Sequence, residues 1–149
     1  MHTHTEEKFL PYPPEVIFDL VADIASYPEF LPWCTATRII ESSDNQMIAE
    51  MAVGYKSIRE TYKSDVRLDR TALTINVTAI SGPFKIMINN WRFESDNKSG
   101  CTAHFHIEFE FGSWLLQKVI GAFFTEVVGK MVSAFEKRAI QIHGAVEPD

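Results

Sequence analysis

The stretch CTAHFHIEFEFGSWLLQKVIGAFFTEVVGKMVSAFEKRAIQIHG, residues 101–144, decides the fold. Its first eleven residues alternate strictly, with an apolar side chain at every odd position. A period of two is typical of a strand with one dry and one wet face. From Ser113 to His143 the apolar residues recur at helical spacing, with Ser113 as N-cap and Gly144 as stop. At 1.5 Å per residue this helix would be about 45 Å long, enough to cross a whole sheet.

The same alternation recurs upstream and predicts the rest of a sheet. His2 to Leu10 alternates loosely, and five further stretches between Thr35 and Phe93 alternate clearly. The segment from about Pro14 to Asp23 is apolar at helical spacing and predicts a short helix. A sheet with one apolar face needs a cover, and the long helix is the large element left to provide it.

These elements predict an α+β fold with one domain spanning residues 1–149. A curved antiparallel sheet of about seven strands wraps around the long C-terminal helix, with a short helix after the first strand. A cavity can open between sheet and helix, and such a cavity is the usual place for a small apolar ligand.

Composition and charge limit which classes of partner we expect. The chain carries 14 basic and 20 acidic residues, a formal net charge of −6, so we expect no DNA partner. There is no signal peptide pattern and no run of about 18 apolar residues, so we expect a cytoplasmic protein, peripheral at the inner membrane at most. Cys34 and Cys101 fit no metal or redox spacing and are expected to be buried or half-buried thiols.

Two patterns bear on metal binding and catalysis. His104 and His106 share a strand face, and His2 and His4 could lie nearby if the first and last strands pair; such spacing can bind zinc. The alternative is an ordinary wet sheet face, and we expect no metal. No G-x-S-x-G, P-loop or H-E-x-x-H motif is present, and we expect no catalytic residues and no enzyme.

Four polar residues fall on the predicted dry face: Glu60, Tyr62, Ser64 and Asn89. Buried polar groups need partners, so these residues either line a cavity or sit at a rim or beyond a bulge that reverses the alternation. If they lie inside, Asn89 and Tyr62 could select a ligand through hydrogen bonds. A cyclase could also be built around Glu60 and Tyr62.

The chain resembles the START-like helix-grip superfamily over residues 7–144. The best match is its coenzyme Q-binding, polyketide-cyclase-like branch, which includes a bacterial ribosome-association toxin. The segments that carry the resemblance are PPEVIFDLVADIASYPEFLPWC (13–34), GYKSIRETYKSDV (54–66), SGPFKIMINNWRF (81–93) and SAFEKRAIQIHG (133–144).

The resemblance implies a hydrophobic tunnel for a lipid quinone, ubiquinone, and a carrier or chaperone that supports respiratory electron transport. The bound quinone would be the ligand, with no other cofactor, and transient contact with a membrane surface would supply it. Two alternatives stay open: an inhibitor of ribosomal subunit association, with the ribosome as partner, and an aromatase/cyclase-like enzyme acting on a polyketide.

Ligand-binding residues are expected on the strands, on the early half of the long helix and in the loop YPEFLPWC, residues 27–34. Two prolines in five positions keep this loop out of regular structure, and its rings could cap the core. In a helix-grip fold it would lie near an opening, as a gate or membrane-contact lip. The full expected set is Phe30, Leu31, Trp33, Tyr55, Glu60, Tyr62, Phe84, Met87, Asn89, Trp91, Phe109, Leu116, Ile120 and Phe123.

Overall fold

The computed structural model describes residues 1–55, 58–121 and 124–144, with the backbone alone at 55, 119–121 and 124–125. Its strands are β1 (His2–Leu10), β2 (Cys34–Ser42), β3 (Gln46–Tyr55), β4 (Ile58–Asp69), β5 (Thr74–Ser81), β6 (Phe84–Ser95) and β7 (Cys101–Phe111). Its helices are α1 (Pro14–Ala22), the 3-10 helix η1 (Ile24–Glu29), α2 (Trp114–Gly121) and α3 (Phe124–His143).

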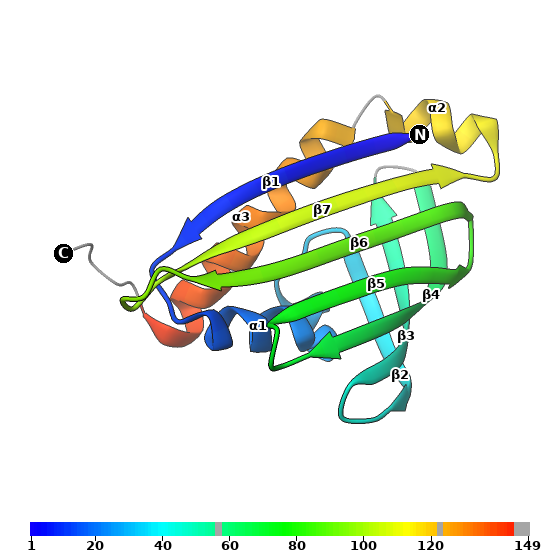
Figure 1. The fold of residues 1–149 in the computed structure, drawn as a ribbon. Helices are drawn as coiled ribbons and strands as arrows, with labels where there is room; N and C mark the ends of the chain where they lie inside the picture. The colour runs from blue at the N-terminus through cyan, green and yellow to red at the C-terminus, as the bar shows by residue number, and fades with distance from the viewer. Residues whose placement is uncertain (56–57, 122–123, 145–149) are drawn as a thin grey trace.

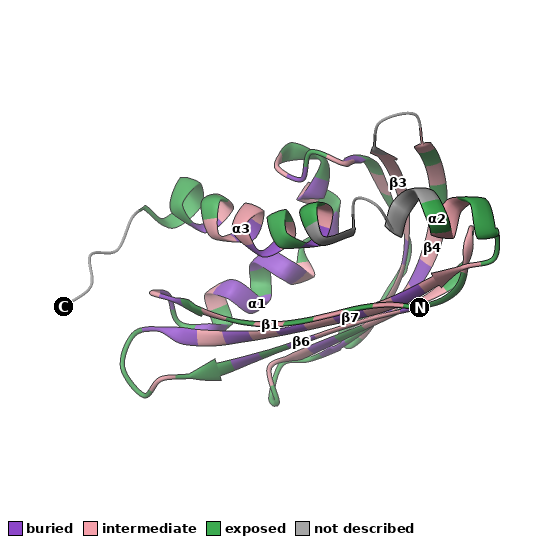
Figure 2. Cartoon of the chain, turned by 90° about the horizontal axis from the view of Figure 1, so that it is seen from above, coloured by how far each residue is buried: buried purple, intermediate pink, exposed green. Residues whose placement is uncertain are grey.

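All seven strands form one antiparallel sheet in the order β1-β7-β6-β5-β4-β3-β2. The first strand pairs with the last, and each remaining strand pairs with its neighbour in the chain. The sheet is curved, and α3 crosses it on the side that α1 also covers (Figure 1 and Figure 2). The predicted α+β helix-grip architecture is confirmed.

The burial of β7 shows why this sheet folds around a helix. Its residues alternate between buried and half-buried from Cys101 to Phe109, and Phe105 is only 1% exposed. Facing this buried side of the sheet, α3 contributes a stripe of buried residues to the core. Helix α1 adds the buried side chains of Ile17 and Phe18. Burial of these apolar faces is the main favourable contribution to folding.

The predicted helix from Ser113 to His143 is described as α2, up to Gly121, and α3, from Phe124, which run in different directions (Figure 1). Residues 122–123 between them lie outside the described residues. α2 therefore lies at the end of β7, while α3 alone crosses the sheet (Figure 1).

The predicted helix ends are confirmed. The Gln117 N–H donates to the Ser113 carbonyl (3.0 Å), which opens α2 after Ser113. Gly144 adopts φ 79°, and its N–H donates to the Ile140 carbonyl (2.9 Å), an αL stop after α3. No helix in the described ranges is both long and apolar enough to cross a membrane.

Candidate functional site

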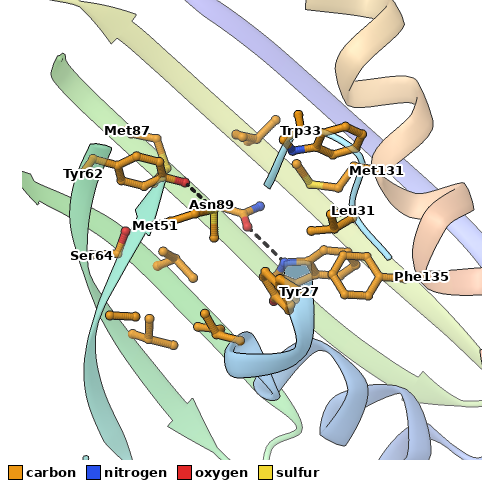
Figure 3. Close-up of a pocket in the computed structure, with 16 residues that line it drawn as sticks. Tyr27, Leu31, Trp33, Met51, Tyr62, Ser64, Met87, Asn89, Met131 and Phe135 are labelled. Atoms are coloured by element: carbon orange, nitrogen blue, oxygen red, sulfur yellow. Dashed lines mark hydrogen bonds between the residues drawn. The ribbon is translucent and has the colours of Figure 1, made fainter. Parts of the chain in front are cut away.

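A cavity between the sheet and α3 has two adjoining compartments. The first, which we call the Asn89 compartment, has a volume of about 90 Å³ and lies between the middle of the sheet, η1 and α3 (Figure 3). The second, the Glu60 compartment, has about 140 Å³ and lies at the ends of β3, β4, β6 and β7. They share the lining residues Trp33, Tyr62, Ile107 and Met131.

Asn89 is held in one orientation inside its compartment. Its amide Nδ2 donates to the His106 carbonyl (3.0 Å), and its Oδ1 accepts from the Trp91 indole Nε1–H (3.0 Å). An asparagine amide has two donor hydrogens and two acceptor lone pairs. Each end of the Asn89 amide therefore keeps capacity for one further hydrogen bond.

Tyr62 and Ser64 add hydroxyl groups from β4 to the same compartment. The Tyr62 hydroxyl donates to the Met51 sulfur (3.4 Å), which is a weak acceptor. Burial raises the pKa of Tyr62 above its usual value, so the phenol stays protonated at neutral pH. Ser64 is 6% exposed, and its side chain lines the compartment. A ligand oxygen could accept from either hydroxyl.

Tyr27 of η1 forms a wall of the Asn89 compartment. Its hydroxyl donates to the Val21 carbonyl, and its ring packs edge-on against Phe135 of α3 with centroids 5.4 Å apart. Burial raises the pKa of this phenol too. The wall between η1 and α3 is thus closed by aromatic contacts.

Among the residues that the structure describes, the lining of the Glu60 compartment is apolar apart from Glu60 and the hydroxyl of Tyr62. Phe84 lies edge-on to Tyr62 (5.0 Å between centroids) and stacks on Phe111 (5.0 Å). Among the described lining residues of both compartments, Glu60 is the only charged one, and it is half-buried. This compartment is suited to hydrocarbon.

Most of the expected residues that the structure describes do line this cavity. The four polar residues whose position was left open, Glu60, Tyr62, Ser64 and Asn89, all line the cavity; Ser64 is buried and the other three are half-buried. The other expected residues found in the lining are Leu31, Trp33, Phe84, Met87, Trp91 and Phe109. Tyr55, Ile120 and Phe123 lie outside the side chains that the structure describes.

Two expected residues lie elsewhere. Phe30 packs on the outer side of Phe135 (5.2 Å between centroids), with the Arg138 guanidinium 5.2 Å from its ring, and faces a surface groove instead of the cavity. Leu116 lies on α2 and lines neither compartment. Leu116 does not reach the cavity because α2 lies at the end of β7, whereas α3 crosses the sheet (Figure 1).

The helix residues that do line the cavity were not predicted as site residues. They belong to α3: Val127, Val128, Met131 and Phe135. Three of them share the spacing i, i+3, i+7 with the buried Val132 between, which is the signature of a single helix face. That spacing marks a face, but it does not tell a residue packed in the core from one that lines a cavity.

The expected membrane-contact lip is only partly at the surface. Leu31 is 4% exposed and lines the Asn89 compartment, and its N–H donates to the Tyr27 carbonyl of η1 (2.9 Å). Trp33 is half-buried and lies between the two compartments. In this structure the loop forms a cavity wall, and Leu31 is not placed to touch a bilayer.

The histidine pairs do not converge. β1 and β7 do pair, but the His2 and His4 rings lie beside Phe109 and Phe105 on the inner face. On the outer face, the His104 ring lies between two carboxylates, with its Nδ1 3.2 Å from Glu7 Oε1 and its Nε2 3.1 Å from Glu94 Oε1. The Nε2 of His106 lies 3.2 Å from Glu108 Oε2. Across residues 1–55, 58–121 and 124–144, no three such side chains form a group that could hold a metal ion.

Comparison with known proteins gives consistent results. The sequence profile of the family described as polyketide cyclase/dehydrase and lipid transport matches residues 10–136. The ribosome association toxin RatA of Rickettsia prowazekii is 43% identical over 138 residues, which cover 91% of this chain and 94% of the toxin. The mitochondrial coenzyme Q-binding protein COQ10 homolog B of Xenopus laevis is 33% identical over 147 residues, 97% of this chain and 60% of that protein.

Solved structures agree on the fold. A START superfamily protein from Mycobacterium smegmatis superimposes with a TM-score of 0.78 at 15% identity, covering 95% of this chain and 99% of that one. An identity this low shows a shared fold and carries nothing about the ligand.

Proposed function

Because this chain belongs to the polyketide cyclase/dehydrase and lipid transport family, we propose that it binds a lipid quinone such as ubiquinone in the cavity between sheet and α3. The protein acts as a carrier or chaperone that supports respiration and does not catalyse a reaction. One observation carries the proposal: hydrogen-bonding groups gather in the Asn89 compartment, and the adjoining Glu60 compartment is almost wholly apolar. A lipid with a polar ring and an apolar tail has the same division.

The polar groups matter for selection. Each buried CH2 contributes about 0.8 kcal/mol relative to water, but a lipid quinone starts in a bilayer that is already apolar. Moving the tail from the bilayer into the protein therefore gains little free energy. The choice of a quinone over other lipids then depends on shape and on hydrogen bonds to the ring oxygens. The Tyr62 and Ser64 hydroxyls and the Asn89 amide are placed to supply them.

The size of the cavity bears on how the ligand is held. Compartments of about 90 and 140 Å³ are smaller than the roughly 300–1,000 Å³ of typical ligand pockets. We therefore propose that the quinone ring occupies the Asn89 compartment and that the tail passes through the Glu60 compartment toward solvent or lipid. The side chains around Met131, which borders both, must then move apart.

Organic extraction of the purified protein, followed by mass spectrometry, tests the proposal. We expect a polyprenyl quinone at a near-stoichiometric level. Protein that carries no quinone, and that takes up none when a short-tailed quinone is offered in detergent, would overturn the proposal.

A second candidate is association with the ribosome and inhibition of subunit joining. The observation that favours it is the 43% identity to a protein named as a ribosome association toxin. The net charge of −6 gives no general attraction to ribosomal RNA, so docking would depend on specific contacts. Sucrose-gradient sedimentation of ribosomal subunits with added protein tests it: a fall in joined ribosomes supports this role, and an unchanged profile rejects it.

A further inference from the structure

The helix α2 carries the two most exposed large apolar side chains found on the helices in the described part of the chain. Trp114 is 74% exposed and Leu115 is 60% exposed. Hydrogen bonds of Gln117 hold α2 against the sheet. The Gln117 side-chain oxygen accepts from the Phe111 N–H (2.8 Å), and the backbone carbonyl oxygen of Gln117 lies 3.3 Å from the Nε2 of His2. Because these bonds hold α2 in place, Trp114 and Leu115 are presented outward on a fixed support.

This helix lies at the rim of the Glu60 compartment. Two residues separate α2 from the end of β7, and Phe111, the last residue of β7, lines that compartment. The Gly112 N–H donates to the carbonyl of Pro83 (2.9 Å), another lining residue. α2 therefore lies beside the end of β7, the strand whose last residue lines the compartment through which the ligand tail would pass (Figure 1).

The charge around α2 differs from that of the whole chain. Between Glu110 and Glu126 there is no acidic residue, and Lys118 is the one basic residue, in a chain of net charge −6. The Lys118 Nζ lies 5.8 Å from the centroid of the Trp114 indole. Tryptophan and lysine side chains both favour the interface of a bilayer, since each has an apolar body and a polar end.

We propose that α2 docks this protein onto a phospholipid surface, with Trp114 and Leu115 inserted among the headgroups and Lys118 paired to lipid phosphate. This inference rests on the proposed function, because a ligand dissolved in a bilayer must be reached there. At eight residues α2 is about 12 Å long and lies in the interface. A second copy of the chain fits less well, since a stable dimer buries about 800 Å² per partner.

Flotation with vesicles made of equal parts phosphatidylcholine and phosphatidylglycerol tests the docking surface. We expect the double variant Trp114→Ser, Leu115→Ser to lose binding by about tenfold or more, because both side chains stay in water. Ile142→Ser is the matched control: Ile142 is 52% exposed but lies near the far end of α3, so its replacement leaves binding unchanged. A wild-type protein that ignores the vesicles, or equal losses in both variants, would overturn the inference.

Lys118→Glu provides a second variant that leaves the apolar side chains intact. We expect it to weaken binding to the mixed vesicles more than to vesicles of phosphatidylcholine alone, because its effect acts on anionic headgroups. Equal binding of this variant and the wild type to the mixed vesicles would show that lipid phosphate does not recognise Lys118.

Loading with a short-tailed quinone in detergent separates this inference from the proposed function. The double variant should take up quinone from detergent as the wild type does, and should take it up from vesicles more slowly. If neither protein takes up quinone and only the wild type floats, quinone binding fails and docking stands. If both take it up from vesicles at the same rate, docking through α2 fails and quinone binding stands.

Discussion

Asn89 is the residue on which ligand selection most depends in this proposal. Asn89→Leu removes the acceptor of the Trp91 Nε1–H, and Trp91 is 4% exposed, so a buried donor loses its partner. We expect a loss of about 1–3 kcal/mol in the free energy of unfolding, measured by urea denaturation. We also expect a change in the amount or identity of the quinone that mass spectrometry finds in the purified protein.

Asn90→Leu is the control for this change. Asn90 is the next residue on β6 and faces the other side of the sheet, where its amide donates to Asn76 (2.7 Å). It should leave the bound quinone as it is. If Asn89→Leu does the same, Asn89 has no part in holding the ring.

The two thiols give the protein a predictable response to alkaline pH. Burial raises the pKa of Cys34 to about 11, and burial together with nearby carboxylates such as Asp96 raises that of Cys101 to about 11. The folded state thus favours the neutral thiol. The neutral thiols therefore contribute to the free energy of unfolding. This contribution is complete below the ordinary thiol pKa near 9 and declines as the pH rises toward 11.

We expect iodoacetamide at pH 8 to label both thiols far more slowly in the native protein than in urea, as followed by mass spectrometry. We also expect the free energy of unfolding to fall between pH 9 and 11, and Cys101→Ala to make that fall shallower. Rapid native labelling would show that the thiols are reachable by solvent.

At the scale of elements, the contact between α3 and η1 holds the cavity closed. Phe135 is 3% exposed, and its ring lies 5.4 Å from Tyr27 and 5.3 Å from Trp91. Phe135→Ala should lower the free energy of unfolding by about 3–5 kcal/mol, since it leaves a void in the core. Ile142→Ala, on an exposed part of the same helix, should change it by less than about 0.5 kcal/mol. Urea denaturation of both variants measures the difference, and similar values would place Phe135 outside the core.

The sequence predicted where elements begin and end better than how they lie. The bounds of β1 and α1 agree with the periodicity to within a residue, because alternation and helical spacing are local. The sequence did not predict that α2 and α3 run in different directions, because the apolar run continues through both.

At the scale of the whole molecule, ligand binding should stabilise the fold, because the cavity exists only in the folded state. A ligand at about one hundred times its Kd adds roughly 2.7 kcal/mol. For a chain of 149 residues we expect a rise in Tm of about 5–10 °C with a short-tailed quinone in detergent. The measurement is calorimetry against detergent alone and against a hydrocarbon of equal length. A hydrocarbon that raises Tm equally would show that the ring is not recognised.

The sequence by itself determined the fold class. Strict alternation put Glu60, Tyr62 and Asn89 on the predicted dry face, but it left open whether they line a cavity or sit at a rim, and only the structure places them in the cavity lining. The need to cover an apolar sheet then identifies the last helical segment as its partner.

Only the tertiary structure decided which inward residues line a cavity and which fill the core. Leu31 and Phe30 are neighbours in one loop, yet one lines the cavity and the other lies outside it. Trp114 and Met131 belong to one apolar run, yet one faces solvent at the rim and the other lies between the compartments. The physical reason is that a cavity is the space left between elements, and that space depends on how α2, α3 and η1 are placed against the sheet rather than on any local pattern.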